Sequence, residues 1–373
     1  MTARATIAAM TAYTLELREA EHKLNQNESP FDFPFKEEAL ARVAARAWNR
    51  YPDFESSTLR ETLARAYGYT ADNILVGNGS NELLAATVST FVGPGTPVVF
   101  PKPTFALYEK LVTVAGGLPV PIDIDPLAGL LPLDEMLNAL STLRGAVVIV
   151  CSPNNPTGGV LPDDGITQLL ATGATVLFDR AYGDFAEDEL PPLHDGLVTF
   201  STFSKAWGLA ALRVGWLAST AATCREIRKV KLPYSLNVIS ETVAALALEN
   251  RAYRDTNVAF LIAERERVFA AMRAMKHVTA FPSRSNFIAF RSNAAFEDFL
   301  ERGILIRKYA TFLRVSIGTR EENDAFLAAL EECGRPARKS SGVSPGDQKR
   351  AEDSGRPGCP TAAGETPALQ ETK

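Results

Sequence analysis

A lysine, Lys205, and an arginine, Arg213, lie eight positions apart in the stretch "FSTFSKAWGLAALRVGW", residues 200–216. The apolar run before this lysine is typical of a buried strand, and a helical pattern follows it. A lysine that only aids solubility needs no such setting, because any exposed position suits it. An amine that is desolvated at the end of a strand can act as a nucleophile or as a base. Lys205 is therefore the first candidate for a catalytic residue.

Other polar residues follow the ends of predicted strands. In "VGNGSNE", Gly79 lets the backbone approach a ligand, while Ser80 and Asn81 begin a predicted helix whose free N–H groups can bind an anion. The turn "CSPNNPTGG" places Asn155 after the strand "AVVIV". Both motifs also have an ordinary explanation, because glycine turns and polar helix caps occur in proteins of every kind.

The strand "VLFD" ends at Asp179, and Tyr182 follows it closely in "DRAY". A carboxylate at the end of a buried strand is costly unless it is paired, so Asp179 either caps a helix or faces a basic group. Together the strand ends carry four kinds of group. Asp179 is an acid, Asn155 and Tyr182 are neutral hydrogen-bonding groups, and Lys205 is an amine. The residues that could bind an anion are Gly79, Ser80, Asn81, Ser204 and Arg213.

One cofactor requires all of these groups at once. Pyridoxal phosphate has a phosphate, a pyridine nitrogen that a carboxylate keeps protonated, a phenolic oxygen, and an aldehyde that condenses with a lysine. The sequence therefore predicts a pyridoxal phosphate site in which Lys205 forms the Schiff base.

The elements that must position these residues alternate between strand and helix patterns over residues 73–218. Seven candidate strands are "NILVG", "TPVVFP", "LPVPIDID", "AVVIVCSP", "ATVLFD", "LVTFSTF" and "RVGWLAS". Strands that are apolar throughout and alternate with helices predict an α/β fold whose mainly parallel sheet is covered on both faces. Ligands bind such sheets beyond the carboxyl ends of the strands, where the candidate residues lie.

The pattern changes after Pro233, where a long helical stretch precedes shorter elements of α+β type. We predict an N-terminal arm and part of a small domain over residues 1–45, a large cofactor-binding domain over 46–232, and a small C-terminal domain over 233–334. Residues 335–373 contain no aromatic residue and almost no large aliphatic one. We expect this tail to be disordered, because it cannot bury enough surface to offset the loss of chain entropy.

Composition sets further limits. The 373 residues are 46% hydrophobic, which is ample for a large core, and the net charge of −5 argues against a partner that is a nucleic acid or an anionic membrane. The N-terminus matches neither a secretory signal nor a membrane span. The four cysteines are far apart and lack metal-ligand spacing. We expect no metal site, free thiols and a cytoplasmic protein.

The sequence resembles the pyridoxal phosphate-dependent aminotransferases of fold type I, and among them the histidinol-phosphate aminotransferases. The similarity runs from about residue 23 to residue 332. Its most specific motifs are "PNNPTG", "SKAWGLAALR" and "FLRVSIGTREEND", and "KLNQNESPFDFP", "RYPD" and "PKPTFALY" support them by their order and spacing. The resemblance implies a seven-stranded, mainly parallel sheet between helices in the large domain, with a smaller α+β domain beside it.

The resemblance also implies a role for each matching residue. Lys205 binds the cofactor and shuttles the proton, Asp179 pairs with the pyridine nitrogen, and Asn155 and Tyr182 hold the phenolic oxygen. Phe105 takes the place of the aromatic residue that stacks on the ring. The residues implied around the phosphate are Gly79, Ser80, Asn81, Thr202, Ser204 and Arg213, together with Tyr51, which reaches the cofactor of a partner subunit and so implies a homodimer.

On the substrate side, the resemblance implies that Asn25 and Asn27 border the substrate. It also implies that Arg314 and Arg307 bind the anionic group of the substrate. The sequence departs from the family pattern at three places. Arg180 follows the aspartate where an acidic residue is usual, Asn81 stands where an aspartate is common, and the stretch between Arg307 and Arg314 is short. We expect Arg180 to point away from the ring.

The implied reaction transfers an amino group from L-glutamate to imidazole acetol phosphate, giving L-histidinol phosphate and 2-oxoglutarate in L-histidine biosynthesis. An aromatic amino-acid aminotransferase and a threonine-phosphate decarboxylase use the same groups and remain alternatives. A non-catalytic binding or regulatory protein on this fold predicts loss of the lysine or an added DNA-binding module. The sequence has neither feature.

Overall fold

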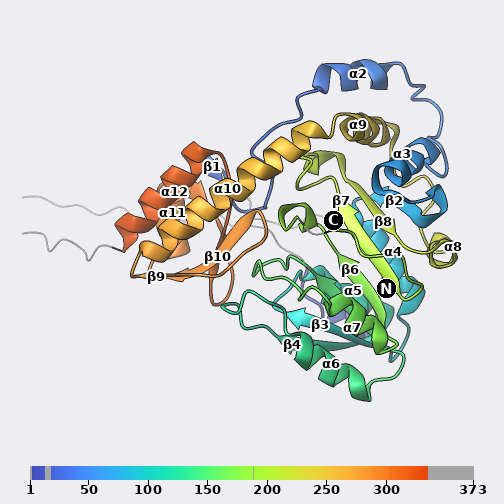
Figure 1. Cartoon of the computed structure of the whole chain (residues 1–373), viewed down its shortest axis with the longest axis horizontal. Coiled ribbons are helices and arrows are strands. Elements are labelled where there is room, and N and C mark those ends of the chain that lie inside the picture. The colour runs from blue at the N-terminus through green and yellow to red at the C-terminus, as the bar shows by residue number, and fades with distance from the viewer. Residues whose placement is uncertain (1, 13–17, 188, 335–373) are drawn as a thin grey trace, which may run out of the picture. The chain divides into compact units, whose positions relative to one another are not determined.

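Seven strands form the central sheet of the computed structural model, which describes residues 2–12, 18–187 and 189–334 (Figure 1). In spatial order they are Ile74–Asn78 (β2), Val214–Ala218 (β8), Leu197–Thr202 (β7), Thr175–Asp179 (β6), Val147–Cys151 (β5), Pro97–Lys102 (β3) and Leu118–Asp123 (β4). Strand β8 is antiparallel to both of its neighbours, and the other neighbouring pairs are parallel. The predicted α/β fold with a mainly parallel sheet of seven strands is confirmed.

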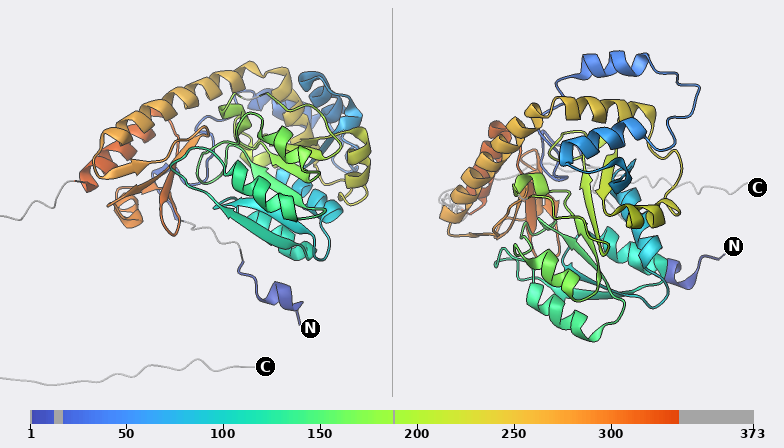
Figure 2. Two further views of the ribbon diagram at one scale, coloured as in Figure 1. Left: turned by 60° about the horizontal axis from the view of Figure 1, so that its bottom comes forward. Right: turned by 45° about the vertical axis from the view of Figure 1, so that its right-hand side comes forward.

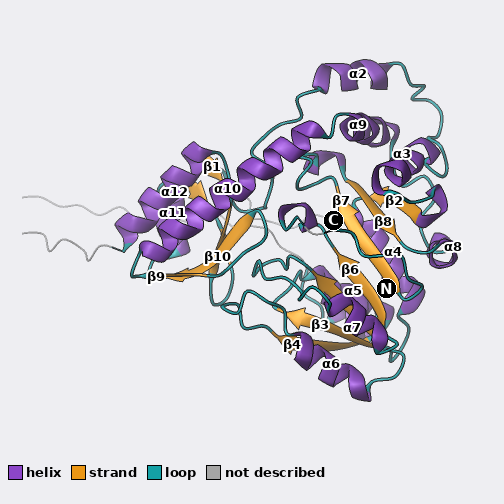
Figure 3. Ribbon diagram, viewed as in Figure 1, coloured by secondary structure: helices purple, strands orange, loops and turns teal. Residues whose placement is uncertain are grey.

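Helices cover both faces of this sheet (Figure 3). They are Ser57–Tyr67 (α3), Ser80–Phe91 (α4), Leu107–Ala115 (α5), Leu133–Thr142 (α6), Gly165–Ala171 (α7), Ala221–Arg228 (α8) and Val238–Glu249 (α9), and Lys36–Ala44 (α2) packs on α9. Side chains of β5 alternate between two apolar cores, with Val147 and Ile149 in one and Val148 and Val150 in the other. Burial on both faces explains why this strand is apolar throughout its length.

A second, antiparallel sheet follows later in the chain (Figure 2). Its strands, in spatial order, are Arg307–Lys308 (β12), Leu313–Ser316 (β13), Phe287–Ser292 (β10) and Val278–Ala280 (β9), and the helices around it are Ala252–Ala274 (α10), Phe296–Leu300 (α11) and Arg320–Cys333 (α12). Near the N-terminus, His22–Lys23 (β1) pairs in parallel with Ile304–Leu305 (β11). The shortest pieces are the helix Ala5–Ala8 (α1) and the 3₁₀ turns Ala71–Asn73 (η1), Gly183–Phe185 (η2) and Ala210–Leu212 (η3).

The long helical pattern after Pro233 is two helices, because α9 ends at Glu249 and α10 begins at Ala252. At the break, the side-chain amide of Asn250 donates to the backbone oxygen of Leu246 at 3.0 Å and satisfies a carbonyl at the end of α9. The domain boundaries after residues 45 and 232 stay a prediction. The predicted disordered tail, 335–373, lies outside the described residues.

The sheet topology gathers the candidate residues at one edge. Strands β2, β5, β6 and β7 run in the same direction, so the residues that follow them lie beyond the same edge of the sheet. Because β8 runs in the opposite direction, its first residue is at this edge, and Arg213 directly precedes it. In the part of the chain that the structure describes, no helix is both long and apolar enough to cross a membrane.

The close contact between β8 and the start of α4 should make Gly215 sensitive to substitution. A Cβ atom at Gly215 would lie 2.1 Å from the backbone nitrogen of Ser80 and 2.4 Å from the backbone carbon of Gly79. Neither backbone atom can move without shifting α4, so we expect Gly215→Ala to destabilise the fold by roughly 1–3 kcal/mol. Thermal unfolding should show a lowered Tm for this variant. The control Gly93→Ala, whose Cβ would meet no atom within 4 Å, should unfold near the wild-type Tm, and equal behaviour of the two variants would refute the argument.

Candidate functional site

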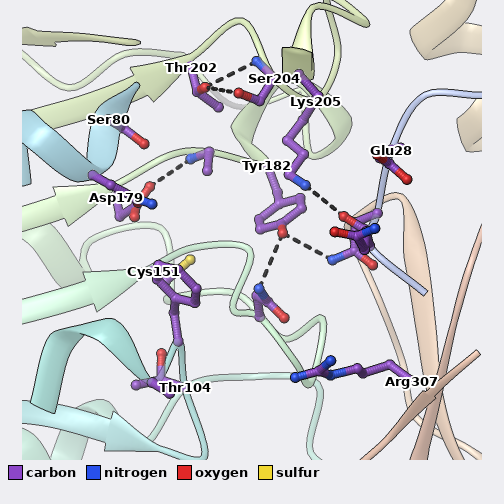
Figure 4. Close-up of a pocket in the computed structure, with 18 of the residues that line it drawn as sticks. Glu28, Ser80, Thr104, Cys151, Asp179, Tyr182, Thr202, Ser204, Lys205 and Arg307 are labelled. Carbon is purple, nitrogen blue, oxygen red and sulfur yellow. Dashed lines mark hydrogen bonds between the residues drawn. The ribbon is translucent and has the colours of Figure 1, made fainter. Parts of the chain in front are cut away.

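A cavity of about 470 Å³ lies beyond the carboxyl edge of the central sheet, a size that is usual for small-molecule sites. Fourteen of the sixteen predicted site residues line it, namely Asn25, Asn27, Ser80, Asn81, Phe105, Asn155, Asp179, Tyr182, Thr202, Ser204, Lys205, Arg213, Arg307 and Arg314. In Figure 4, Asp179 and Lys205 lie beyond the strand ends, Glu28 marks the N-terminal segment on the other side, and Arg307 extends from β12. The structure therefore brings together residues that lie up to 289 positions apart.

One end of the cavity is built to hold an anion. The backbone of Gly79 is left-handed, with a φ of 78°, and helix α4 begins at the next residue, Ser80. The Arg213 guanidinium lies so close to Gly79 that a Cβ there would come within 2.7 Å of its Nη2. Arg213 also donates to Ser204 Oγ at 3.2 Å, and the Thr202 hydroxyl donates to the same oxygen at 3.0 Å. A helix N-terminus, two hydroxyls and a guanidinium are together the kind of groups that can hold a phosphate.

The carboxylate of Asp179 is buried and faces the same cavity. Its Oδ2 accepts a hydrogen bond from the hydroxyl of Tyr108 at 2.8 Å, and its Oδ1 accepts one from the backbone nitrogen of Ala181 at 2.9 Å. Burial raises the pKa of Asp179, and these two hydrogen bonds act in the opposite direction. The role of Tyr108 was not predicted, although its position three residues after Phe105, in the first turn of α5, was a usable signal.

The hydroxyl of Tyr182 is held by two amides. Asn27 Nδ2 donates to it at 3.0 Å and Asn155 Nδ2 donates at 3.2 Å. Both amides use the lone pairs of the oxygen, so the phenolic hydrogen of Tyr182 stays available for an acceptor inside the cavity. Burial raises the pKa of Tyr182, which keeps this hydrogen in place at neutral pH.

Lys205 reaches the middle of the cavity between these groups (Figure 4). Its Nζ donates to the backbone oxygen of Gln26 at 2.9 Å and lies 5.7 Å from the centre of the Tyr182 ring. Burial lowers the pKa of Lys205 to about 7, and the nearby charge of Arg314 lowers it further than that of Arg213 does. Both arginines therefore favour the neutral amine, and Arg314 has the larger effect.

The two arginines on the small sheet lie directly opposite each other, because Arg307 of β12 pairs with Arg314 of β13 in the antiparallel register. Arg314 donates through Nη1 to Asn155 Oδ1 and, at 2.9 Å, to the hydroxyl of Tyr309. Its Nη2 donates to the backbone oxygen of Asn25 at 2.8 Å. All three acceptors are neutral. Tyr309 lines the cavity, and its place two residues after Arg307 in an extended segment was the signal that sequence reasoning missed.

Two predicted site residues do not line the cavity. Gly79 lies directly behind it, against Arg213. Tyr51 is 82% exposed and stacks on Tyr234, with ring centroids 4.7 Å apart. Arg180, which departs from the family pattern, is buried but is not part of the cavity lining.

The comparisons with known proteins agree with this geometry. The family model described as "Aminotransferase class I and II" matches residues 21–330. The chain belongs to the class I and II aminotransferase family.

Individual relatives within this family are similar over most of their length. The histidinol-phosphate aminotransferase of Thermococcus gammatolerans is 37% identical over 319 residues, which cover 83% of this chain and 91% of that protein. The histidinol-phosphate aminotransferase of Pyrococcus furiosus is 34% identical, and the match also covers 83% of this chain and 91% of that protein. The crystal structure of the histidinol-phosphate aminotransferase from Sinorhizobium meliloti, solved with pyridoxal-5'-phosphate, is 26% identical with a TM-score of 0.79, and the match covers 88% of this chain and 96% of that one.

These findings confirm three predictions made from the motifs, namely the fold, the resemblance to histidinol-phosphate aminotransferases, and a pyridoxal phosphate-dependent aminotransferase. The residues that line the cavity of this aminotransferase also fit the cofactor, independently of the relatives. The buried Asp179 carboxylate has two hydrogen-bond donors but no cation in contact among the described residues, which a protonated ring nitrogen would supply.

In the described part of this aminotransferase, no group of three or more histidine, cysteine and acidic residues is placed to hold a metal ion. Three of its cysteines, Cys151, Cys224 and Cys333, are free thiols.

The lowered pKa of Lys205 predicts how the stability of the cofactor-free aminotransferase depends on pH. Between about pH 7 and pH 10.5 the folded chain has released the Lys205 proton while the unfolded chain retains it, so the free energy of unfolding should rise with pH across this window. Lys205→Met removes the titrating group. We therefore expect wild type to be less stable than Lys205→Met near pH 6, by up to a few kcal/mol, and to approach it near pH 10.

Urea unfolding of both chains at several pH values measures this difference. Lys276→Met, which changes an exposed lysine outside the cavity, is the control and should keep the wild-type pH dependence. A constant difference between wild type and Lys205→Met over this pH range would show that the amine is not shifted.

Proposed function

We propose that this chain is a histidinol-phosphate aminotransferase that takes the amino group of L-glutamate and transfers it to imidazole acetol phosphate. The products are L-histidinol phosphate and 2-oxoglutarate. The similarity to histidinol-phosphate aminotransferases supports the proposal. One observation of the site supports a substrate that carries a phosphate.

That observation is the pairing of Arg307 with Arg314. Residues directly opposite each other in an antiparallel pair project on the same face of the sheet, where like charges destabilise one another. Both side chains line the cavity, and no carboxylate of the described residues forms an ion pair with either. Figure 4 shows the Arg307 side chain extended into the cavity. A dianionic phosphate offsets two adjacent cations, whereas a single carboxylate offsets one.

The same arginines serve both substrates, because the amino donor also carries a carboxylate. Arg314 is held in place before any ligand arrives by Asn155, Tyr309 and the backbone of Asn25, so little is lost in ordering it when an anion binds. The neutral partners fix its orientation and leave its charge for the substrate.

The remaining residues hold the cofactor and move the proton. In the proposed site Ser80, Thr202, Ser204 and Arg213 would hold the phosphate, as the resemblance implies. Asp179 would hold the ring nitrogen, Tyr182 and Asn155 would hold the phenolic oxygen, and Phe105 would pack against the ring.

When bound, pyridoxal phosphate supplies a carrier for the amino group and a sink for electrons. Lys205, with a pKa of about 7, is neutral in a large fraction of molecules at physiological pH and can take the proton from the α-carbon of the substrate.

The substrate is tested by adding amino compounds separately to the cofactor-loaded enzyme and recording the absorbance of the cofactor. L-histidinol phosphate and L-glutamate should each convert it to the amino form, while phosphothreonine should release no CO2. Conversion by aromatic amino acids but not by L-histidinol phosphate would favour an aromatic aminotransferase. Release of CO2 from phosphothreonine would favour the decarboxylase.

A variant tests the paired arginines directly. Arg307→Gln removes one of the two opposed cations, so we expect KM for L-histidinol phosphate to rise about 10-fold or more. Arg291→Gln, which changes an exposed arginine on β10, should leave KM within twofold. An unchanged KM in Arg307→Gln would remove this residue from the substrate site.

We also propose a homodimer in which Tyr51 reaches the cofactor of the partner subunit, and a cytoplasmic location, which the free thiols support. Tyr51 lies outside the cavity of its own chain. Its ring stacks on that of Tyr234, which also contacts the ring of Phe54, and all three side chains are exposed. Trp48 and Leu232, which are close to them in the sequence, are exposed as well. Apolar exposure on this scale is typical of an interaction surface.

Hybrid subunits can test the position of Tyr51. Tyr51→Phe should weaken cofactor binding by roughly 10-fold or more through loss of a hydrogen bond to phosphate, and Lys205→Ala should be inactive. If Tyr51 acts across the interface, a mixed dimer of the two variants contains one site with both residues intact. Mixing the two chains should then raise cofactor affinity and activity above those of either variant. If the mixture is no more active than the Tyr51→Phe chains in it are by themselves, Tyr51 does not act in the partner's site.

A further inference from the structure

Tyr309 lies in the short connection that distinguishes this chain from the family pattern. Four residues, 309–312, join β12 to β13, and the backbone nitrogen of Tyr309 donates to the backbone oxygen of Phe312 at 2.9 Å. The rings of Tyr309 and Phe312 stack with centroids 4.8 Å apart, and Phe312 in turn contacts the buried ring of Phe281 at 5.5 Å. The ring of Tyr309 is therefore fixed by its own hairpin.

This fixed ring directs its hydroxyl into the cavity, beside the proposed anion site. The oxygen accepts a hydrogen bond from Arg314 Nη1 at 2.9 Å, and Tyr309 is one of the residues that line the cavity. It is half-buried, so part of its surface faces open space. A hydroxyl that accepts from a cation is polarised and becomes a better donor through its own hydrogen.

Among the described residues, the hydroxyl of Tyr309 has one hydrogen bond, which it accepts from Arg314. None of these residues accepts the hydrogen of this hydroxyl. The hydroxyl of Tyr182, by comparison, is held by two amides deeper in the same cavity. The unused hydrogen of Tyr309 is thus a donor placed next to Arg314 and two residues from Arg307.

We propose that Tyr309 is a substrate-binding residue that donates its phenolic hydrogen to the phosphate of the substrate; this rests on the proposed function. A phosphate monoester has three terminal oxygens, and Arg307, Arg314 and Tyr309 offer a donor to each. A carboxylate has two oxygens, which the two arginines satisfy. Tyr309 therefore favours the phosphorylated substrate over the carboxylate of the amino donor, because a site with an unmet donor rejects the ligand that cannot accept from it.

The test compares two ligands that differ only in the phosphate. Tyr309→Phe keeps the ring on Phe312 and removes the hydroxyl. KM of the cofactor-loaded protein for L-histidinol phosphate should rise about 10- to 100-fold, the usual effect of a lost hydrogen bond to a charged group. Binding of L-histidinol, and KM for L-glutamate, should change by less than about threefold. Tyr69→Phe, which removes a hydroxyl outside the cavity, should match wild type for all three compounds.

Other outcomes overturn the proposal in separable ways. An equal loss for L-histidinol phosphate and L-glutamate would show that Tyr309 only positions Arg314, which serves both. No loss for either would show that its hydroxyl does not contact the substrate. If wild type itself binds L-histidinol phosphate no better than L-histidinol, the proposed function fails, and the assignment of Tyr309 fails with it.

Discussion

Three consecutive residues, Asn25 to Asn27, hold the two sides of the cavity together through hydrogen bonds. The backbone oxygen of Asn25 accepts from Arg314 on the small sheet, and that of Gln26 accepts from Lys205 beyond the central sheet. Asn27 joins both sides, since its side chain bonds to Tyr182 and to Ser316. Asn27 adopts a left-handed backbone with a φ of 55°, a costly conformation that persists because its buried polar groups are all held.

The electrostatics of the cavity follow from the cations that this arrangement collects. Arg213 and Arg314 both lower the pKa of Lys205, so they favour the neutral amine that can take a proton. In the proposed site the same two guanidinium groups would bind the phosphate of the cofactor and the anionic group of the substrate. Both effects require that no carboxylate cancels these charges, and none of the described residues forms an ion pair with either arginine.

Sequence patterns were sufficient for the fold class and for most of the site. Apolar runs such as β5, buried on both faces, predict a covered parallel sheet without any knowledge of partners. Once a sheet is parallel, the residues after its strands must meet at one edge, and this is why Asp179, Lys205 and Asn155 could be assigned to one ligand. The family motifs then added Arg307 and Arg314, which no local pattern joins to that edge.

The sequence by itself thus determined the fold, the family and the cofactor, and it predicted most of the residues that line the cavity. Only the tertiary structure decided which groups form hydrogen bonds with these side chains. Tyr108 bonds to Asp179, the backbone of Gln26 to Lys205, and Tyr309 to Arg314. It also set Arg307 opposite Arg314 rather than one residue away. Local periodicity reports which face of an element is buried. Contacts between residues 71 or 179 positions apart depend instead on how elements pack and on strand register, where a shift of one residue reverses the face of every side chain.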